Sequence, residues 1–129
     1  MTKLIYIPIY GVNVVFCWEL DKDEWIKFCK RWKTKIKEDE KNEILSDIDN
    51  EGVDGSTLKL DTGDYIVYVK TLLHKNVAHE IYHTCNFILM SRGFEHNEAD
   101  EAYAYLIGYL TDEVYKAIET KGSASTLPF

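Results

Sequence analysis

The chain has 129 residues and a mass of 15.0 kDa, a length that suits one domain with a core of its own. Its 22 acidic residues exceed its 15 basic residues, for a net charge of −7, and so acidic a chain repels phosphate backbones. The cysteines are three, an odd number with no close pairing, which argues against a disulfide framework, and the lack of a Cys-x-x-Cys pair argues against a thiolate zinc site.

The N-terminal apolar run is too short for a signal peptide and is interrupted by Pro8. No stretch approaches the roughly 20 apolar residues that a membrane-spanning helix needs. We therefore expect a cytoplasmic protein, in a bacterial cell's own cytoplasm or in that of a host.

Two runs near the N-terminus are rich in β-branched and aromatic residues, Leu4–Tyr10 and Val14–Trp18. Gly11 and Asn13 lie between them, so the pattern predicts a hairpin. Pro8 has no amide hydrogen to donate, which favours an edge position or a bulge for the first strand.

Residues 21–36, DKDEWIKFCKRWKTKI, place apolar side chains at spacings of three and four, which predicts an amphipathic helix capped by Asp21 or Asp23. We interpret its lysines and arginine as a solvated face. Residues 37–57, KEDEKNEILSDIDNEGVDGST, are polar and rich in turn formers, so they predict a surface loop with one weak helical turn near Ile44.

Alternating residues around Gly63 predict a second hairpin, formed by Leu58–Leu60 and Tyr65–Lys70. Two long helices follow, one over residues 74–92 that stops at Gly93 and one over residues 98–118. The expected fold is α+β, with a small twisted sheet of two hairpins packed against the helices. It forms one domain over residues 1–120, followed by a flexible tail over residues 121–129.

The stretch NVAHEIYHTC, residues 76–85, places His79 and His83 four positions apart, on one face of a helix. Two such imidazoles can occupy two corners of a tetrahedral zinc site. Glu80 follows His79 directly, so its carboxylate lies near such a metal and can act as a general base. A random chain of this length shows the pattern on the order of once in a few hundred. The motif therefore favours a metal site over two histidines that merely share a helix.

A zinc site needs a third protein ligand, and the next helix offers Glu101 and Glu98. A helical wheel favours Glu101, because the apolar residues of that helix gather on the opposite side. Ala104 and Gly108 lie beside Glu101, and we expect these small residues to let this helix approach the histidine helix closely. Tyr105 then lies one turn below Glu101.

The stretch HEIYHTCNFILMSRG, followed by DEAYAYLIGYLTDEV, resembles the zincin metallopeptidases whose third zinc ligand is glutamate. More narrowly, residues 58–118 resemble small phage and prophage zinc peptidases and, more distantly, the bacterial family that cleaves phage-type repressors. This resemblance implies a minimal zincin-like fold with Zn²⁺ held by His79, His83 and Glu101. It also implies hydrolysis of a peptide bond by a zinc-bound water that Glu80 activates.

The third ligand follows the same resemblance, because a Glu-Ala-x-Ala-Tyr-Leu stretch aligns with the residues from Glu101 onward. A thermolysin-like pattern would select Glu98 instead, but the aspartate expected four positions later is Ala102. Glu98 remains the alternative.

Zincin substrates lie extended beside an edge strand, and the strand before the histidine helix is the candidate here. The expected substrate-binding residues are Tyr65, Val67, Val69 and Tyr105, and the expected partner is a peptide or protein, not a nucleic acid or a membrane. Two alternatives stay open. One is another zinc hydrolase, such as a cell-wall amidase, and the other is a non-catalytic zinc-binding regulatory protein that retains the fold.

Overall fold

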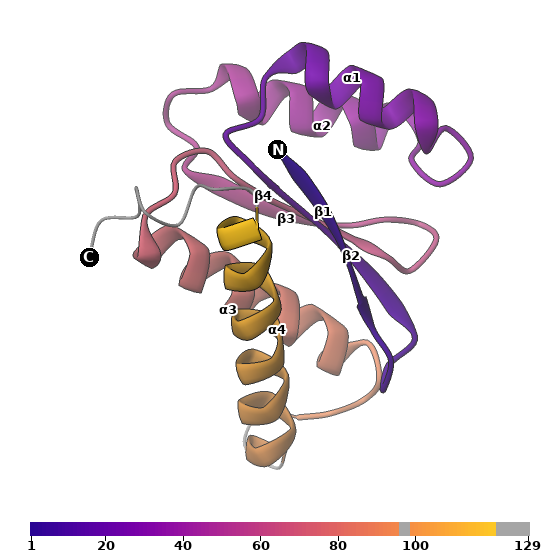
Figure 1. The fold of residues 1–129 in the computed structure, drawn as a ribbon. Coiled ribbons are helices and arrows are strands. Elements are labelled where there is room, and N and C mark those ends of the chain that lie inside the picture. Colours follow the sequence, from indigo (N-terminus) through magenta and orange to yellow (C-terminus); the bar gives the residue numbers. More distant parts are fainter. Residues whose placement is uncertain (96–98, 121–129) are drawn as a thin grey trace.

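The computed structural model describes residues 1–95 and 99–120. The chain forms an α+β fold with a four-stranded sheet in the order β1-β2-β4-β3, which confirms the predicted fold class (Figure 1). The predicted tail, residues 121–129, lies outside the described residues. The elements in chain order are β1 (Thr2–Ile7), β2 (Val12–Trp18), α1 (Lys22–Arg31), α2 (Glu38–Asp49), β3 (Gly55–Lys59), β4 (Tyr65–Val69), α3 (His74–Met90) and α4 (Asp100–Thr120).

Both predicted hairpins are confirmed, because β1 pairs antiparallel with β2 and β3 pairs antiparallel with β4. The two hairpins join through β2 and β4, which run parallel with Phe16 opposite Val67. A parallel pair needs a long crossover connection, and α1 and α2 supply it. Strand β1 lies at an edge and ends at Ile7, directly before Pro8, as the missing amide hydrogen of proline predicts.

The expectation that the Tyr65–Lys70 strand forms an edge is wrong. Strand β4 lies between β2 and β3, so its backbone groups are used on both sides. The side chains of Tyr65, Val67 and Val69 lie in the core, with at most 3% of their surface exposed. The edge strand that lies next to α3 is β3, not β4.

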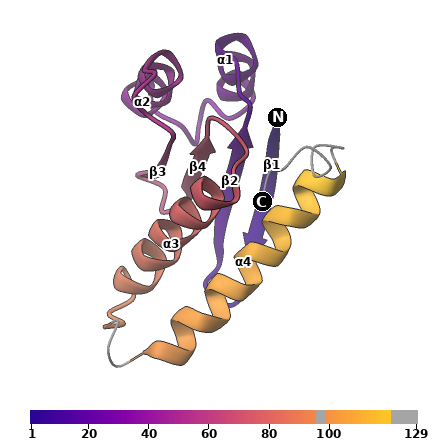
Figure 2. The same cartoon turned by 90° about the vertical axis from the view of Figure 1, so that its left-hand side faces the viewer.

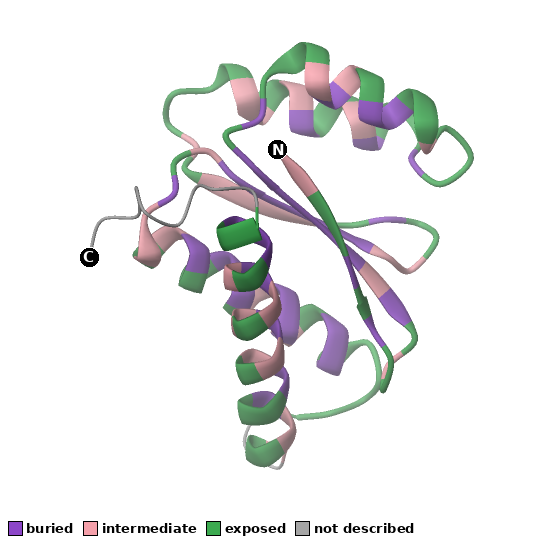
Figure 3. Cartoon of the chain, in the orientation of Figure 1, coloured by how far each residue is buried: buried purple, intermediate pink, exposed green. Residues whose placement is uncertain are grey.

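Helices α1 and α2 cover one face of the sheet, and α3 and α4 cover the other (Figures 1 and 2). Strand β2 is therefore buried on both faces, with Phe16 directed to the α3–α4 side and Cys17 to the α1–α2 side. This burial explains its continuous apolar sequence, VNVVFCW. Buried residues line both sides of the central strands, whereas the outer faces of the helices are exposed (Figure 3).

Helix α1 begins as predicted, because the Asp21 carboxylate accepts a hydrogen bond of 2.8 Å from the backbone N–H of Glu24. The helix ends at Arg31, and the remainder of the predicted helix forms turns over residues 32–36.

The prediction of a surface loop over residues 37–57 is wrong, because twelve of these residues form α2. Ile44 is fully buried against the sheet. The carboxylate of Glu40 accepts hydrogen bonds from the backbone N–H groups of Lys37 (2.8 Å) and Asp61 (2.9 Å). Ile44, with the partly buried Leu45 and Ile48, and one buried carboxylate thus hold a helix whose apolar pattern is too sparse to predict it.

Helix α3 begins at His74 as predicted, and Gly93 lies just beyond its end with a φ of 81°. The backbone N–H of Phe94 donates to the carbonyl of Leu89 (3.1 Å), which closes the helix end in the manner typical of a left-handed glycine. Within the described ranges, no helix is both long enough and apolar enough to cross a membrane.

Candidate metal site

The two histidines of the motif meet on the outer face of α3, opposite the side that packs on the sheet. Their Nε2 atoms lie 3.0 Å apart, and their ring centroids lie 4.6 Å apart. Two nitrogens bound at 2.0–2.1 Å to a tetrahedral zinc ion are about 3.3 Å apart. The donor atoms of His79 and His83 are therefore close to the separation that a shared metal requires.

Glu80 lies between the histidine pair and β3, and only 6% of its surface is exposed. The hydroxyl of Thr57 donates to Glu80 Oε1 (2.9 Å), while Glu80 Oε2 lies 4.0 Å from His79 Nε2. One carboxylate oxygen is thus fixed by β3, and the other faces the histidines. This is the arrangement that a general base beside a metal needs.

Gly55 explains how β3 passes so close to this carboxylate. A Cβ atom at Gly55 would lie 2.6 Å from the carbonyl oxygen of Tyr68 and 3.1 Å from Glu80 Oε2. No side chain fits in that space, so a glycine is required where the strand meets the motif.

Two cavities meet at the motif and share Gly55, His79 and Glu80. The larger, of about 480 Å³, extends toward Lys75 and the loop before β3. The smaller, of about 290 Å³, extends past His83 toward Phe87. Together they give solvent and ligands access to the histidines along the β3 side of α3.

The pairing register shows which backbone groups of β3 face outward. Leu60 donates to the carbonyl of Asp64, and Lys70 donates to the carbonyl of Asp54, so the even-numbered residues from 54 to 60 are hydrogen-bonded to β4. The backbone groups of Gly55, Thr57 and Lys59 therefore point away from β4, at the open edge beside the histidines.

Glu101 does not join this group. It is exposed in the first turn of α4, on the side away from the buried residues of that helix. Among residues 1–95 and 99–120, no three His, Cys, Asp or Glu side chains cluster as a metal site. Glu98, the alternative ligand, lies outside the described residues.

The expectation that Ala104 and Gly108 bring α4 close to the histidine helix is wrong. Both are exposed, and a Cβ atom at Gly108 would meet nothing within 4 Å. Helix α4 packs through its apolar face instead, where the hydroxyl of Tyr103 donates to Asn86 Oδ1 of α3 (3.1 Å). Burial raises the pKa of Tyr103, so its phenol stays protonated and remains a donor. Tyr105 is 64% exposed and points away from this contact.

The Tyr103–Asn86 bond also fixes the height of Glu101 along α3. Asn86 lies three residues beyond His83, or about 4.5 Å along the helix axis at 1.5 Å per residue. Helix α4 begins at Asp100 and folds back along α3 (Figure 2), so its first turn, which contains Glu101, lies level with the C-terminal end of α3, beyond the histidines.

The structure thus brings together His79, His83 and Glu80, while Glu101 and Tyr105 stay apart from them. The sequence reasoning missed Thr57 and Gly55. Their signal in the sequence is weak, because a Gly-x-Thr sequence indicates a contact with Glu80 only once β3 is known to run beside the motif.

Comparison with known proteins gives no match, whether with protein-family models, with curated proteins or with solved structures. The chemistry of the site therefore has to be argued from its own geometry.

Proposed function

We propose that the chain is a zinc-dependent peptidase in which His79 and His83 hold the metal and Glu80 is the general base. One observation carries the proposal: two imidazole nitrogens lie 3.0 Å apart, and a buried carboxylate lies 4.0 Å from one of them. Bound zinc supplies a Lewis acid that can polarise a peptide carbonyl and activate water near neutral pH.

The protein's own contribution centres on Glu80. Its free oxygen would accept a proton from the attacking water and later deliver that proton to the leaving amine. Thr57 fixes the other oxygen, so the carboxylate needs little reorganisation to act. The open edge of β3 would hold an extended peptide through the outward backbone groups of Gly55, Thr57 and Lys59.

Glu101 remains the proposed third ligand, with Glu98 as the alternative. Because Glu101 faces solvent at the end of α3, ligation by it requires the first turn of α4 to rotate and to shift toward the histidines. Metal binding supplies the free energy for such a shift, because ligation stabilises whichever arrangement completes the site.

The second candidate function is a non-catalytic zinc-binding regulatory protein. The observation that favours it is the missing third ligand among the described residues, since a catalytic zinc site has three protein ligands. The two functions differ in what Glu80 does, because only the peptidase needs its carboxylate.

Zinc stoichiometry tests the metal site directly. We expect one zinc per chain in the wild type, loss of zinc in His79→Ala and Glu101→Ala, and retention in Glu98→Ala and Glu80→Gln. Loss in Glu98→Ala with retention in Glu101→Ala would transfer the third ligand to Glu98. A wild-type protein that binds no zinc would overturn the proposal.

Cleavage of a mixed peptide library tests the base. Glu80→Gln retains size and hydrogen bonding but cannot accept the proton, so we expect zinc binding without cleavage. Cleavage by neither protein would favour the regulatory function, and equal cleavage by both would refute Glu80 as the general base.

A further inference from the structure

The other face of the molecule carries a concentrated positive charge. Residues 27–37 contain six of the chain's 15 basic residues and none of its 22 acidic residues. All six are exposed. The sequence suggested a merely solvated helix face, but α1 ends at Arg31, and the turns over residues 32–36 place Lys33 and Lys37 beside the same cavity as Lys30.

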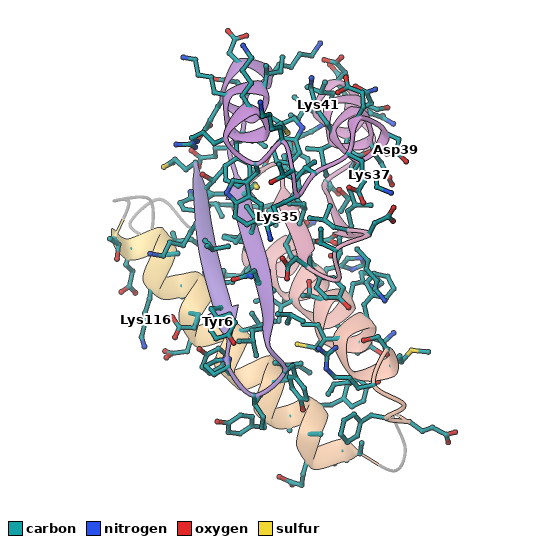
Figure 4. All side chains as sticks on the ribbon, turned by 90° about the vertical axis from the view of Figure 1, so that its right-hand side faces the viewer. Tyr6, Lys35, Lys37, Asp39, Lys41 and Lys116 are labelled. Atoms are coloured by element: carbon teal, nitrogen blue, oxygen red, sulfur yellow. The ribbon has the colours of Figure 1, made fainter. Side chains whose placement is uncertain are left out.

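Three of these cations, Lys30, Lys33 and Lys37, line a cavity of about 490 Å³ between α1 and α2, which we call the α1–α2 cavity. Its apolar lining is Ile26, Cys29 and Ile36, of which the last two are 6% exposed. Its charged lining is Lys30, Lys33, Lys37, Glu38 and Lys41. The cavity thus combines an apolar floor with a rim that is mostly basic (Figure 4 labels Lys37 and Lys41).

Two of the rim lysines already have partners, because Lys37 pairs with Asp61 and Lys41 pairs with Glu38. In the described part of the chain, no carboxylate lies within 4.0 Å of Lys30 or Lys33. Like charges this close repel one another, so an anionic partner that met both would relieve that repulsion.

We propose that the α1–α2 cavity docks an acidic segment of a partner protein, with a large apolar side chain of that segment inserted between the lysines. The basic rim selects carboxylates, and the apolar floor gives an aliphatic or aromatic anchor a place to bury its surface. A small anion would leave the floor unused.

A nucleic acid fits the surroundings less well. Outside residues 27–37 the chain has nine basic residues against all 22 acidic ones, so a long polyanion would meet repulsion beyond the patch. Screening confines the attraction to about 8 Å at physiological salt, which suits a short segment that touches only the rim. This docking site lies across the sheet from His79 and does not depend on zinc.

Fluorescence anisotropy with labelled 12-residue probes tests the proposal. The main probe repeats Glu-Glu-Leu four times, and the controls replace its leucines by serine, replace its glutamates by lysine, or use a 12-nucleotide single-stranded DNA. The protein variants are Lys30→Glu/Lys33→Glu and a control of equal charge change, Lys3→Glu/Lys116→Glu. Both control lysines are exposed and lie away from the cavity, Lys3 on β1 and Lys116 on α4 (Figure 4 labels Lys116).

We expect the Glu-Glu-Leu probe to bind at least tenfold more tightly than either peptide control and than the DNA. Lys30→Glu/Lys33→Glu should weaken binding at least fivefold at 50 mM salt and less at 500 mM, whereas the control variant should change it less than twofold. Undetectable binding at 100 μM protein would overturn the proposal. Equal binding of the serine probe or the DNA would overturn it too, as would equal loss in the two variants. Dimerisation of the protein that Lys30→Glu/Lys33→Glu abolishes would assign the cavity to a second copy instead.

Discussion

Gly55→Ala is the sharpest test of the contact between β3 and the motif. The added methyl would lie 2.6 Å from a backbone oxygen of β4 and 3.1 Å from Glu80, so the strand or Glu80 has to move. Overpacking of this kind costs about 1–3 kcal/mol, and the lower chain entropy of alanine offsets about 0.5–1 kcal/mol of it. Because the 2.6 Å contact is with backbone, which cannot rotate away, the cost lies in the upper half of that range. We therefore expect a net loss of about 1–2.5 kcal/mol in the free energy of unfolding.

Gly108→Ala provides the matched control, because the same methyl would meet nothing within 4 Å. In the interior of α4, alanine is favoured over glycine by about 0.8–1 kcal/mol, so this variant should be more stable than the wild type. Urea unfolding followed by circular dichroism should show the two midpoints moving in opposite directions. If Gly55→Ala proves neutral or stabilising, β3 does not pass against Glu80 and the geometry of the candidate site is wrong.

Three further changes test other parts of the fold. Ile44→Ala should cost about 2–5 kcal/mol by urea unfolding, because Ile44 is fully buried, and a loss below 0.5 kcal/mol would contradict the helix found there. Asp21→Ala removes the cap of α1 and should cost about 1 kcal/mol, whereas Asp21→Asn should cost a few tenths at most. Burial raises the pKa of the Cys85 thiol from 9.0 to about 12. The folded state therefore holds that proton more tightly than the unfolded state, and stability complete below pH 9 is lost as the pH rises toward 12. Relative to the wild type, Cys85→Ala should flatten the fall in unfolding free energy over this range by up to about 1.4 kcal/mol per pH unit, and an unchanged slope would refute the assignment.

Local patterns were enough to predict every element except α2, but they did not predict the order of the strands in the sheet. The alternation around Gly63 predicts a hairpin correctly, but it carries no information about what lies on the far side of β4. That neighbour is β2, which arrives through a crossover of two helices. Edge and interior strands therefore could not be distinguished from this segment alone.

The packing of α4 shows a second limit. The helical wheel correctly separated the apolar side from the side of Glu101, Ala104 and Gly108. Small residues alone do not predict close approach, because the apolar side has more surface to bury and so determines which face packs. Of the candidate site, His79, Glu80 and His83 were predictable because a fixed helical spacing brings them together. Their contact with Thr57 depends on tertiary structure.

Strand β3 is held on both faces by two consecutive residues. The hydroxyl of Ser56 donates to the Asp47 carboxylate of α2 (2.8 Å), and the hydroxyl of the next residue, Thr57, donates to Glu80 of α3. A slip by one residue would turn each hydroxyl to the wrong face and break both bonds, so the register of this short edge strand is locked. A peptide that adds to β3 would therefore pair with a strand whose register is already fixed. Only the incoming peptide would then lose conformational entropy on binding.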